Sequence, residues 1–211
     1  NINVAKGYQG NPDFLEIIAL STNKKPINIT GWEIRSTVSR YLNKISVGAK
    51  TIYQGRISEE SDILLYPGEK AIILPTKSPV GISFKMNKCI GYLEQFQEFY
   101  PHLPKYCPHP GFDKPQIKDE SCVTFAKTID RCNAFIKEYP EKLSEACKKT
   151  ISKRLSYNSC VSEHIEDTDF YKKEWRVYLG GDEIAFGSEN GDFIGIYDSD
   201  GHLIDSIFYN K

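Results

Sequence analysis

Hydrophobic and polar residues alternate near both ends of the chain, which is the pattern of strands with one buried face. Residues 13–20 alternate, are rich in Ile and Leu and carry no helix cap. Residues 27–39 form a second such segment, in which Trp32 and Ile34 fall on one face. The continuous apolar run 71–74 predicts a strand that is buried on both faces. The first part of the chain is therefore expected to be a β-structure.

The strand pattern resumes close to the C-terminus. Trp175 and Val177 alternate with polar neighbours, and two further strands are predicted at 192–198 and 202–209. Asp198-Ser-Asp-Gly201 lies between these two and predicts a hairpin turn. Short strands separated by turns favour an antiparallel sandwich. A further strand is predicted at 44–54, and short strands are predicted at 63–65 and 184–186.

The middle of the chain has a helical pattern instead. Apolar residues recur every three or four positions over 120–138, which predicts one long helix that ends at Tyr139-Pro140. A second helix follows, with Ser144 as its N-cap. Five prolines between 101 and 115 exclude a continuous helix or a central strand there. The chain is thus interpreted as a β-domain in two parts, 1–84 and 174–211, interrupted by an insertion at 85–173.

All the cysteines fall within this insertion. No Cys-x-x-Cys occurs, so the usual zinc and thioredoxin-type spacings are missing. The alternatives are buried reduced thiols and disulfides. We favour disulfides, because a polar insertion of this kind needs covalent links to stay folded. They would place the protein in an oxidising compartment, extracellular or at the cell surface. The six residues are Cys89, Cys107, Cys122, Cys132, Cys147 and Cys160.

Helix geometry ranks the possible pairings. If the two helices form an antiparallel hairpin, cysteines at equal distance from the break lie level with each other. If the first helix instead stops near Asp130, a local Cys122–Cys132 pair becomes possible. The nested pairs that the hairpin predicts are Cys132 with Cys147, Cys122 with Cys160, and Cys89 with Cys107.

Four segments carry a family resemblance. They are Phe14-Leu-Glu-Ile-Ile, Asn23-Lys-Lys-Pro-Ile-Asn-Ile-Thr-Gly-Trp32, Pro67-Gly-Glu-Lys-Ala-Ile-Ile-Leu74 and the hairpin from Asp192 to Tyr209. Together they resemble the lamin tail domain, in the version found in bacterial exported proteins. The resemblance implies an immunoglobulin-like antiparallel β-sandwich, here with a disulfide-linked α-helical insertion. The residues expected to mark its core are Gly31, Trp32 and Trp175.

The charge balance limits the class of partner. With 27 basic and 28 acidic residues the net charge is −1, so no global field attracts nucleic acid or an anionic membrane. No apolar run approaches the roughly 20 residues of a membrane-spanning helix. The first residues lack the features of a signal peptide, so we expect a mature form or an excised fragment.

The sequence gives only weak signals for catalytic or metal-binding groups. Asp198-Ser-Asp-Gly201 starts like a calcium loop but lacks its later ligands, and a plain hairpin turn fits better. His164, Asp167 and Asp169, with Glu166, have metal-capable side chains but fit a solvated loop better. No nucleophile, dinucleotide or P-loop motif occurs. We therefore expect no catalytic residue, no metal and no cofactor.

Two surfaces of the insertion could bind a partner. The basic residues Lys148-Lys149 and Lys153-Arg154 could meet an acidic partner, although a solvated helical face fits better. Aromatic residues interleaved with prolines could form a rigid recognition surface, or they could cover one face of the sandwich in place of a core. The second alternative is favoured, because a loop this long must bury something to stay ordered. These aromatic residues are Tyr92, Phe96, Phe99, Tyr100, Tyr106 and Phe112.

Taken together, these features predict a non-catalytic exported or cell-surface module that binds or scaffolds an unidentified protein partner, without a membrane span and without nucleic acid. The oligomeric state is left open. One alternative is an accessory domain of a larger secreted hydrolase or nuclease. Another is a calcium- or glycan-binding module.

Overall fold

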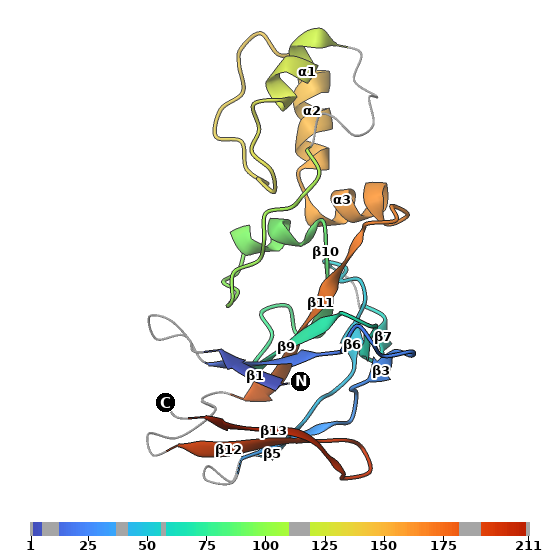
Figure 1. The fold of residues 1–211 in the computed structure, drawn as a ribbon. Helices are drawn as coiled ribbons and strands as arrows, with labels where there is room; N and C mark the ends of the chain where they lie inside the picture. The colour runs from blue at the N-terminus through green and yellow to red at the C-terminus, as the bar shows by residue number, and fades with distance from the viewer. Residues whose placement is uncertain are drawn as a thin grey trace. The chain divides into compact units, whose positions relative to one another are not determined.

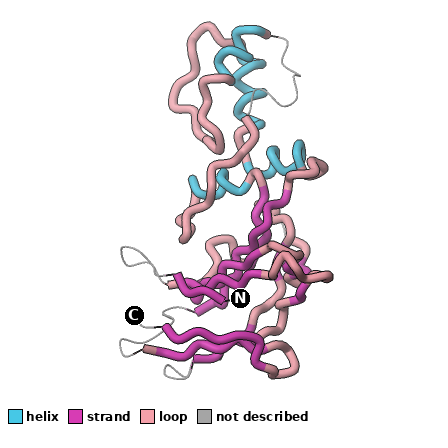
Figure 2. The backbone as a smooth tube through the Cα atoms, viewed as in Figure 1, coloured by secondary structure: helices cyan, strands magenta, loops and turns pink. Residues whose placement is uncertain are grey.

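The described residues fall into two compact units (Figure 1). We name them the β unit, which lies within Asn1–Ile52, Ile57–Met86 and Lys173–Lys211, and the disulfide unit, which comprises Tyr53–Arg56 and Asn87–Lys172. Strand residues outnumber helical residues, and every described helix belongs to the disulfide unit (Figure 2). The computed structural model describes residues 2–5, 13–36, 42–55, 58–109, 119–181 and 191–209.

The elements within these ranges are short. The helices are η1 (a 3-10 helix) Ile90–Gln95, α1 Glu120–Ala126, α2 Glu145–Arg154 and α3 Tyr157–His164. The strands are β1 Ile2–Ala5, β2 Phe14–Ile18, β3 Ile27–Asn28, β4 Glu33–Ser36, β5 Leu42–Lys44, β6 Gly48–Ala49, β7 Glu60–Ser61, β8 Leu64–Leu65, β9 Lys70–Thr76, β10 Ser83–Asn87, β11 Tyr171–Gly181, β12 Asp192–Tyr197 and β13 Leu203–Tyr209.

The larger sheet is mixed, whereas the sequence analysis predicted antiparallel strands throughout. Among the described residues its strand order is β1-β2-β9-β11-β10-β6-β7. β2 pairs with β9 antiparallel, but β11 pairs with β9 parallel, and β10 pairs with β6 parallel. Parallel neighbours need a long crossover connection. The chain from β9 to β11, which includes β10 and the disulfide unit, is such a connection, and sequence patterns do not reveal that β11 inserts between β9 and β10.

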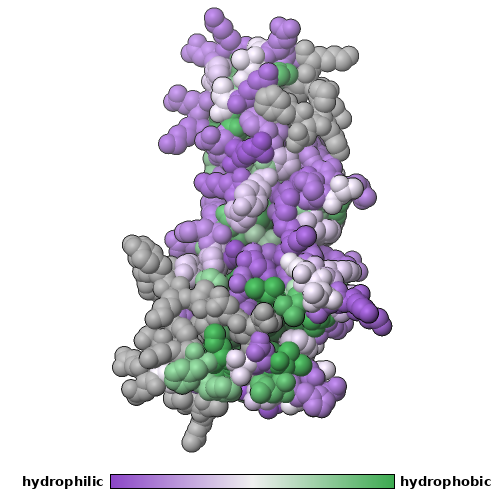
Figure 3. Space-filling model, in the orientation of Figure 1, coloured by the Kyte–Doolittle hydropathy of each residue, from purple (hydrophilic) through white to green (hydrophobic). Residues whose placement is uncertain are grey.

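A smaller sheet has the order β13-β12-β4-β5, and a two-stranded sheet joins β3 to β8 among the described residues. The predicted hairpin of β12 and β13 is confirmed, with the turn at 198–201. β13 lies at the sheet edge, and apolar side chains gather over this part of the molecule on the face drawn in Figure 3. Exposed residues of β13 include Leu203, Ile204 and Phe208.

The main core lies between the two larger sheets, which gives a sandwich-like arrangement. Leu15 of β2, Ile73 of β9 and Val177 of β11 occupy matched register positions and are fully buried. Ile34 of β4 and Ile196 of β12 pair in the smaller sheet and are buried as well. The buried members of this core are Leu15, Ile17, Ala19, Ile29, Trp32, Ile34, Ile45, Ile63, Leu65, Ala71, Ile73, Trp175, Val177, Ile194 and Ile196.

Two strand predictions differ from the structure. The segment 44–54 is not one strand: it is divided between β5 and β6, because Ile45 leaves the ladder to exchange backbone hydrogen bonds with Gly31 and Trp32 (both 2.8 Å). Gly31 has a φ of +85°, which favours glycine at that turn. The predicted strand at 184–186 lies outside the described residues.

A substitution at Gly48 would test how closely this core is packed. A Cβ added there would lie 3.0 Å from Cζ3 of Trp175, 3.0 Å from the carbonyl oxygen of Ser83 and 3.2 Å from Cγ1 of Ile63. We expect Gly48→Ala to lower the free energy of unfolding by about 1–3 kcal/mol, because overpacking forces its neighbours apart. Chemical denaturation measures this, with the exposed Lys50→Ala as control. A Gly48→Ala value within experimental error of that control would contradict the close packing.

Candidate functional site

Three disulfides hold the disulfide unit together. Cys89–Cys160 joins the residue before η1 to α3, across 71 residues. Cys107–Cys132 joins the proline-rich segment to the loop after α1, and Cys122–Cys147 joins α1 to α2, each across 25 residues. No cysteine is free.

The predicted nested pairing is wrong. It required one helix over 120–138, but α1 ends at Ala126. Asp130 then accepts a turn hydrogen bond from the N–H of Asn133 (3.3 Å), and Cys132 has a φ of +59°. Because Cys132 lies in this turn and not on a helix, it points to Cys107 and leaves Cys122 to pair with Cys147. The alternative local pair Cys122–Cys132 is also not formed.

A small core surrounds the third disulfide. Asp119 caps α1 by accepting hydrogen bonds from the N–H groups of Ser121 and Cys122, and Ser144 caps α2 as predicted. The buried residues of this core are Cys122, Ala126, Ile129, Leu143, Cys147, Ile151 and Leu155. Two of its seven members are the disulfide itself, so the link is part of the packing.

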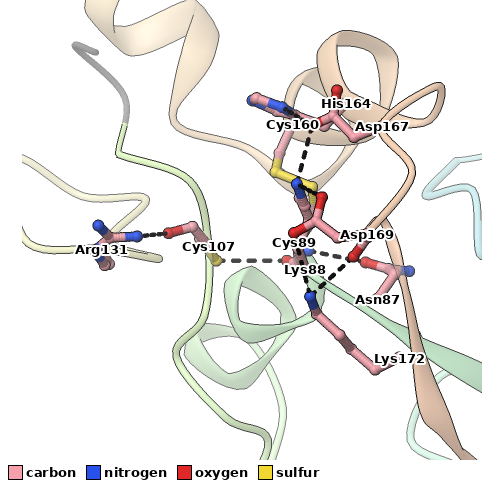
Figure 4. A network of polar contacts seen from close by, with 10 residues as sticks. All are labelled: Asn87, Lys88, Cys89, Cys107, Arg131, Cys160, His164, Asp167, Asp169 and Lys172. Carbon is pink, nitrogen blue, oxygen red and sulfur yellow. Dashed lines mark hydrogen bonds and ion pairs between the residues drawn. A yellow bond between two sulfur atoms is a disulfide. The ribbon is translucent and has the colours of Figure 1, made fainter. Parts of the chain in front are cut away.

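A charged network lies beside the first disulfide (Figure 4). The Lys88 ammonium, whose side chain is only 13% exposed, bonds to the carboxylates of both Asp167 (2.9 Å) and Asp169. Nδ1 of the buried His164 lies 2.8 Å from the same carboxylate of Asp167. Lys172 donates to the carbonyl oxygen of Asp169 (2.9 Å). The sequence predicts a solvated loop here. Asp169, which is 67% exposed, and the exposed Glu166 agree with that prediction, whereas His164 is buried and ion pairs tie the loop to Lys88.

This network shifts the pKa values of Lys88, Asp167 and Asp169. Burial acts to lower the pKa of Lys88, but hydrogen bonds to Asp169 and Asp167 outweigh it and raise that pKa. Hydrogen bonds from Lys88 and then from His164 hold the pKa of Asp167 below its ordinary value, and Lys88 does the same for Asp169. Lys88, Asp167 and Asp169 are therefore charged partners, and the network joins the chain just before η1 to the chain between α3 and β11.

The predicted aromatic surface divides into buried and exposed residues. Tyr92 and Phe99 are each only 2% exposed. Burial, followed by the charge of Glu163, raises the pKa of Tyr92 to about 12. Phe96 and Tyr106 are 54% and 64% exposed. Of the other two residues in the prediction, Tyr100 is half-buried and Phe112 lies outside the described residues.

The exposed Phe96 has an aromatic partner that the sequence pattern does not predict. Its ring lies 5.3 Å from that of Phe135, which is 57% exposed. Two contacts of Gln95 hold the two segments together: its side-chain oxygen accepts the N–H of Ala134 (2.7 Å), and its amide nitrogen donates to the carbonyl oxygen of Cys132. We name Phe96 and Phe135 the aromatic pair. The apolar spacing places Phe135 within the predicted helix 120–138, although Asp130 and Asn133 are residues that favour turns.

Among the described residues, one group of three metal-capable side chains has its ligand atoms close enough together to hold a metal ion. The ligand atoms of Asp198, Asp200 and His202 lie within 4.8 Å of one another at the β12–β13 turn. The Asp198 carboxylate accepts the N–H groups of Asp200 (3.0 Å) and His202 (2.9 Å). The backbone hydrogen bond from His202 is the largest cause that lowers the pKa of Asp198. These bonds build the turn, and three side-chain ligands fall short of the six to eight oxygens that calcium takes.

Comparison with known proteins adds no relative. No protein-family model, no curated protein and no solved structure matches the chain. Among the residues that the structure describes, no helix is both long enough and apolar enough to cross a membrane.

The disulfide pairing can be determined directly by peptide mapping. Digestion without reductant, followed by mass spectrometry, should yield peptides linked as Cys89–Cys160, Cys107–Cys132 and Cys122–Cys147. A Cys132–Cys147 peptide would contradict the structure and restore the nested arrangement.

The charged network predicts a pH dependence. We expect Lys88→Met to raise the pKa of Asp167 toward the ordinary value of about 3.9, because its main stabilising hydrogen bond is lost. Carboxylate pKa values depressed by folding give stability that is present above the ordinary carboxylate pKa and lost as pH falls through the folded pKa. The raised pKa of Lys88 gives stability that is lost at alkaline pH.

Wild type should therefore unfold at a higher temperature than Lys88→Met between about pH 4 and pH 10, with the gap closing outside that range. Carboxyl NMR titration and thermal melts at several pH values measure both effects. The exposed Lys105→Met is the matched control. An unchanged Asp167 titration in Lys88→Met would remove the basis for the network.

Proposed function

We propose that this protein is a non-catalytic binding or scaffolding module that works outside the cytoplasm. In this proposal the β unit is an immunoglobulin-like sandwich of the lamin-tail type, and the disulfide unit is an insertion that carries the binding surface. The two sheets around a shared core support the first part. The disulfides support an oxidising compartment, because such bonds persist there.

The observation that carries the proposal is the aromatic pair. Two phenylalanines, each more than half exposed, lie against each other on the surface. Exposed apolar side chains of this size are costly to leave in water, and aromatic residues are enriched at the centres of protein interfaces. Tyr106, the loop residue that precedes Cys107, adds a third exposed ring to the same disulfide-linked region.

The restraints on the pair favour binding over simple exposure. Gln95, the neighbour of Phe96, bonds to the backbone of Ala134 and Cys132, just before Phe135. The Cys107–Cys132 disulfide also anchors the loop that leads to Phe135. The N–H of Phe135 also donates to the side-chain oxygen of Asn133 (2.9 Å). A surface held in this way loses little conformational freedom when a partner binds, so more of the contact energy appears as affinity.

The test uses a partner captured under oxidising conditions and then purified. We expect Phe96→Ala with Phe135→Ala to weaken its affinity by about 30-fold or more, since hot-spot aromatic residues contribute about 2 kcal/mol or more. Surface plasmon resonance measures the affinity. Phe208→Ala, which removes a phenylalanine that is 67% exposed on β13, is the control.

Both variants should keep the wild-type melting temperature, because the side chains removed are mostly exposed. The proposal fails if the double variant binds as wild type does. It also fails if Phe208→Ala weakens binding to the same degree.

A further inference from the structure

A polar basin opens between α2 and α3 of the disulfide unit. Its volume is about 650 Å³, within the range of small-ligand sites. It shares no residue with the aromatic pair, so it is independent of the proposed function. The residues that line it are Lys149, Thr150, Lys153, Arg154, Asn158, Ser159, Ser162 and Glu163.

The basin carries net positive charge. Lys149 and Lys153 lie four residues apart on α2, and therefore on one face of the helix. Neither makes an ion pair with any residue that the structure describes. Arg154 lies 3.4 Å from the carboxylate of Glu163, so these two charges offset each other. Two exposed ammonium groups are left to bind an anion.

The hydroxyl groups of the basin have already used their hydrogens. Thr150 and Ser162 each donate to the backbone carbonyl four residues earlier, at 2.8 and 2.9 Å. Ser159 donates to the carbonyl oxygen of Lys153 (2.6 Å). A hydroxyl has one donor hydrogen and two acceptor lone pairs. With these bonds in place, the three oxygens present acceptor lone pairs to a ligand.

Asn158, one of the lining residues, is fixed by a polar contact. The side-chain amide of Asn158 donates to the carbonyl oxygen of Gln54 (3.0 Å) and accepts the N–H of Gln54 (3.1 Å). Each wall is tied by its own disulfide, α2 through Cys147 and α3 through Cys160. The backbone of both helices is thus anchored before any ligand arrives.

These properties define the ligand by its chemistry. It must present an anionic group to the lysines and O–H donors to the three hydroxyl oxygens. We propose that the basin binds a saccharide bearing an anionic ester, either sulfate or phosphate. An inorganic anion would satisfy only the lysines and would meet the hydroxyl oxygens lone pair to lone pair. A neutral sugar would leave the ammonium groups without a counter-charge.

Calorimetric titration with matched small probes tests this. The probes are glucose 6-sulfate, glucose 6-phosphate, glucose, inorganic sulfate and inorganic phosphate. At least one ester should bind with a 1:1 stoichiometry, and glucose and both inorganic ions should bind about tenfold more weakly or worse. Whichever ester binds more tightly identifies the natural anionic group. Equal binding of the matching inorganic ion would mean an adventitious ion only and would overturn the proposal.

Variants locate the site. Lys149→Ala with Lys153→Ala should weaken ester binding by about tenfold or more, because charge-assisted hydrogen bonds are lost. Lys137→Ala with Lys142→Ala removes the same charge from exposed positions outside the basin and should change nothing. Alanine is well tolerated on an exposed helix face, so folding should be kept. Equal losses from both pairs would overturn the proposal.

The hydroxyl oxygens are tested separately. Thr150→Ala with Ser162→Ala should weaken binding of the ester and leave binding of the inorganic ion unchanged. An unchanged ester affinity would show that the saccharide hydroxyls make no contact there, and the saccharide assignment would be wrong.

Discussion

The parallel pairing of β11 with β9 is the constraint on which the rest of the β unit depends. Trp175 and Val177 of β11 lie opposite Ala71 and Ile73 of β9, so β11 brings two large side chains into the centre of the core. A parallel neighbour cannot be reached by a tight turn, because the chain must first return to the starting edge of the sheet. Strand β10 makes that return. The N–H of Tyr178 donates to Ser83 at one end of the β10–β11 pair and the N–H of Lys88 donates to the carbonyl oxygen of Phe170 at the other, so β10 runs antiparallel to β11. The disulfide unit lies in the chain between these two antiparallel neighbours.

The disulfide unit meets a different constraint, which is its shortage of apolar side chains. Its α-helices have 7, 10 and 8 residues, all shorter than the roughly 12–15 at which an isolated helix becomes even marginally stable. Its separate core has seven buried members, and two of them are cysteines. In the chain-entropy model, a disulfide that closes a 25-residue loop lowers the entropy of the unfolded chain and so raises its free energy by about 3–4 kcal/mol. Cross-links of that size offset the small area that this core can bury.

The sequence predicted those elements whose signal is local. Alternation located β2, β4 and the β12–β13 hairpin, the apolar run at 71–74 located the buried β9, and Ser144 marked the start of α2. Other features depend on contacts that are remote in sequence. Apolar spacing continues past Ala126, but the helix ends there because the chain turns toward Cys107. Phe135 was missed for that reason, and the parallel position of β11 leaves no mark in its own pattern.

The same reasoning explains why the candidate sites could be predicted only in part. Periodicity placed Lys149 and Lys153 on one helix face, yet a basin needs a second wall. That wall is α3, whose polar sequence gives little helical periodicity and whose position is set by Cys89–Cys160. The aromatic pair likewise needs Cys107–Cys132 and the contacts of Gln95. Each surface therefore depends on a cross-link between distant residues, and rigidity imposed in that way reduces the entropy that a ligand must overcome on binding.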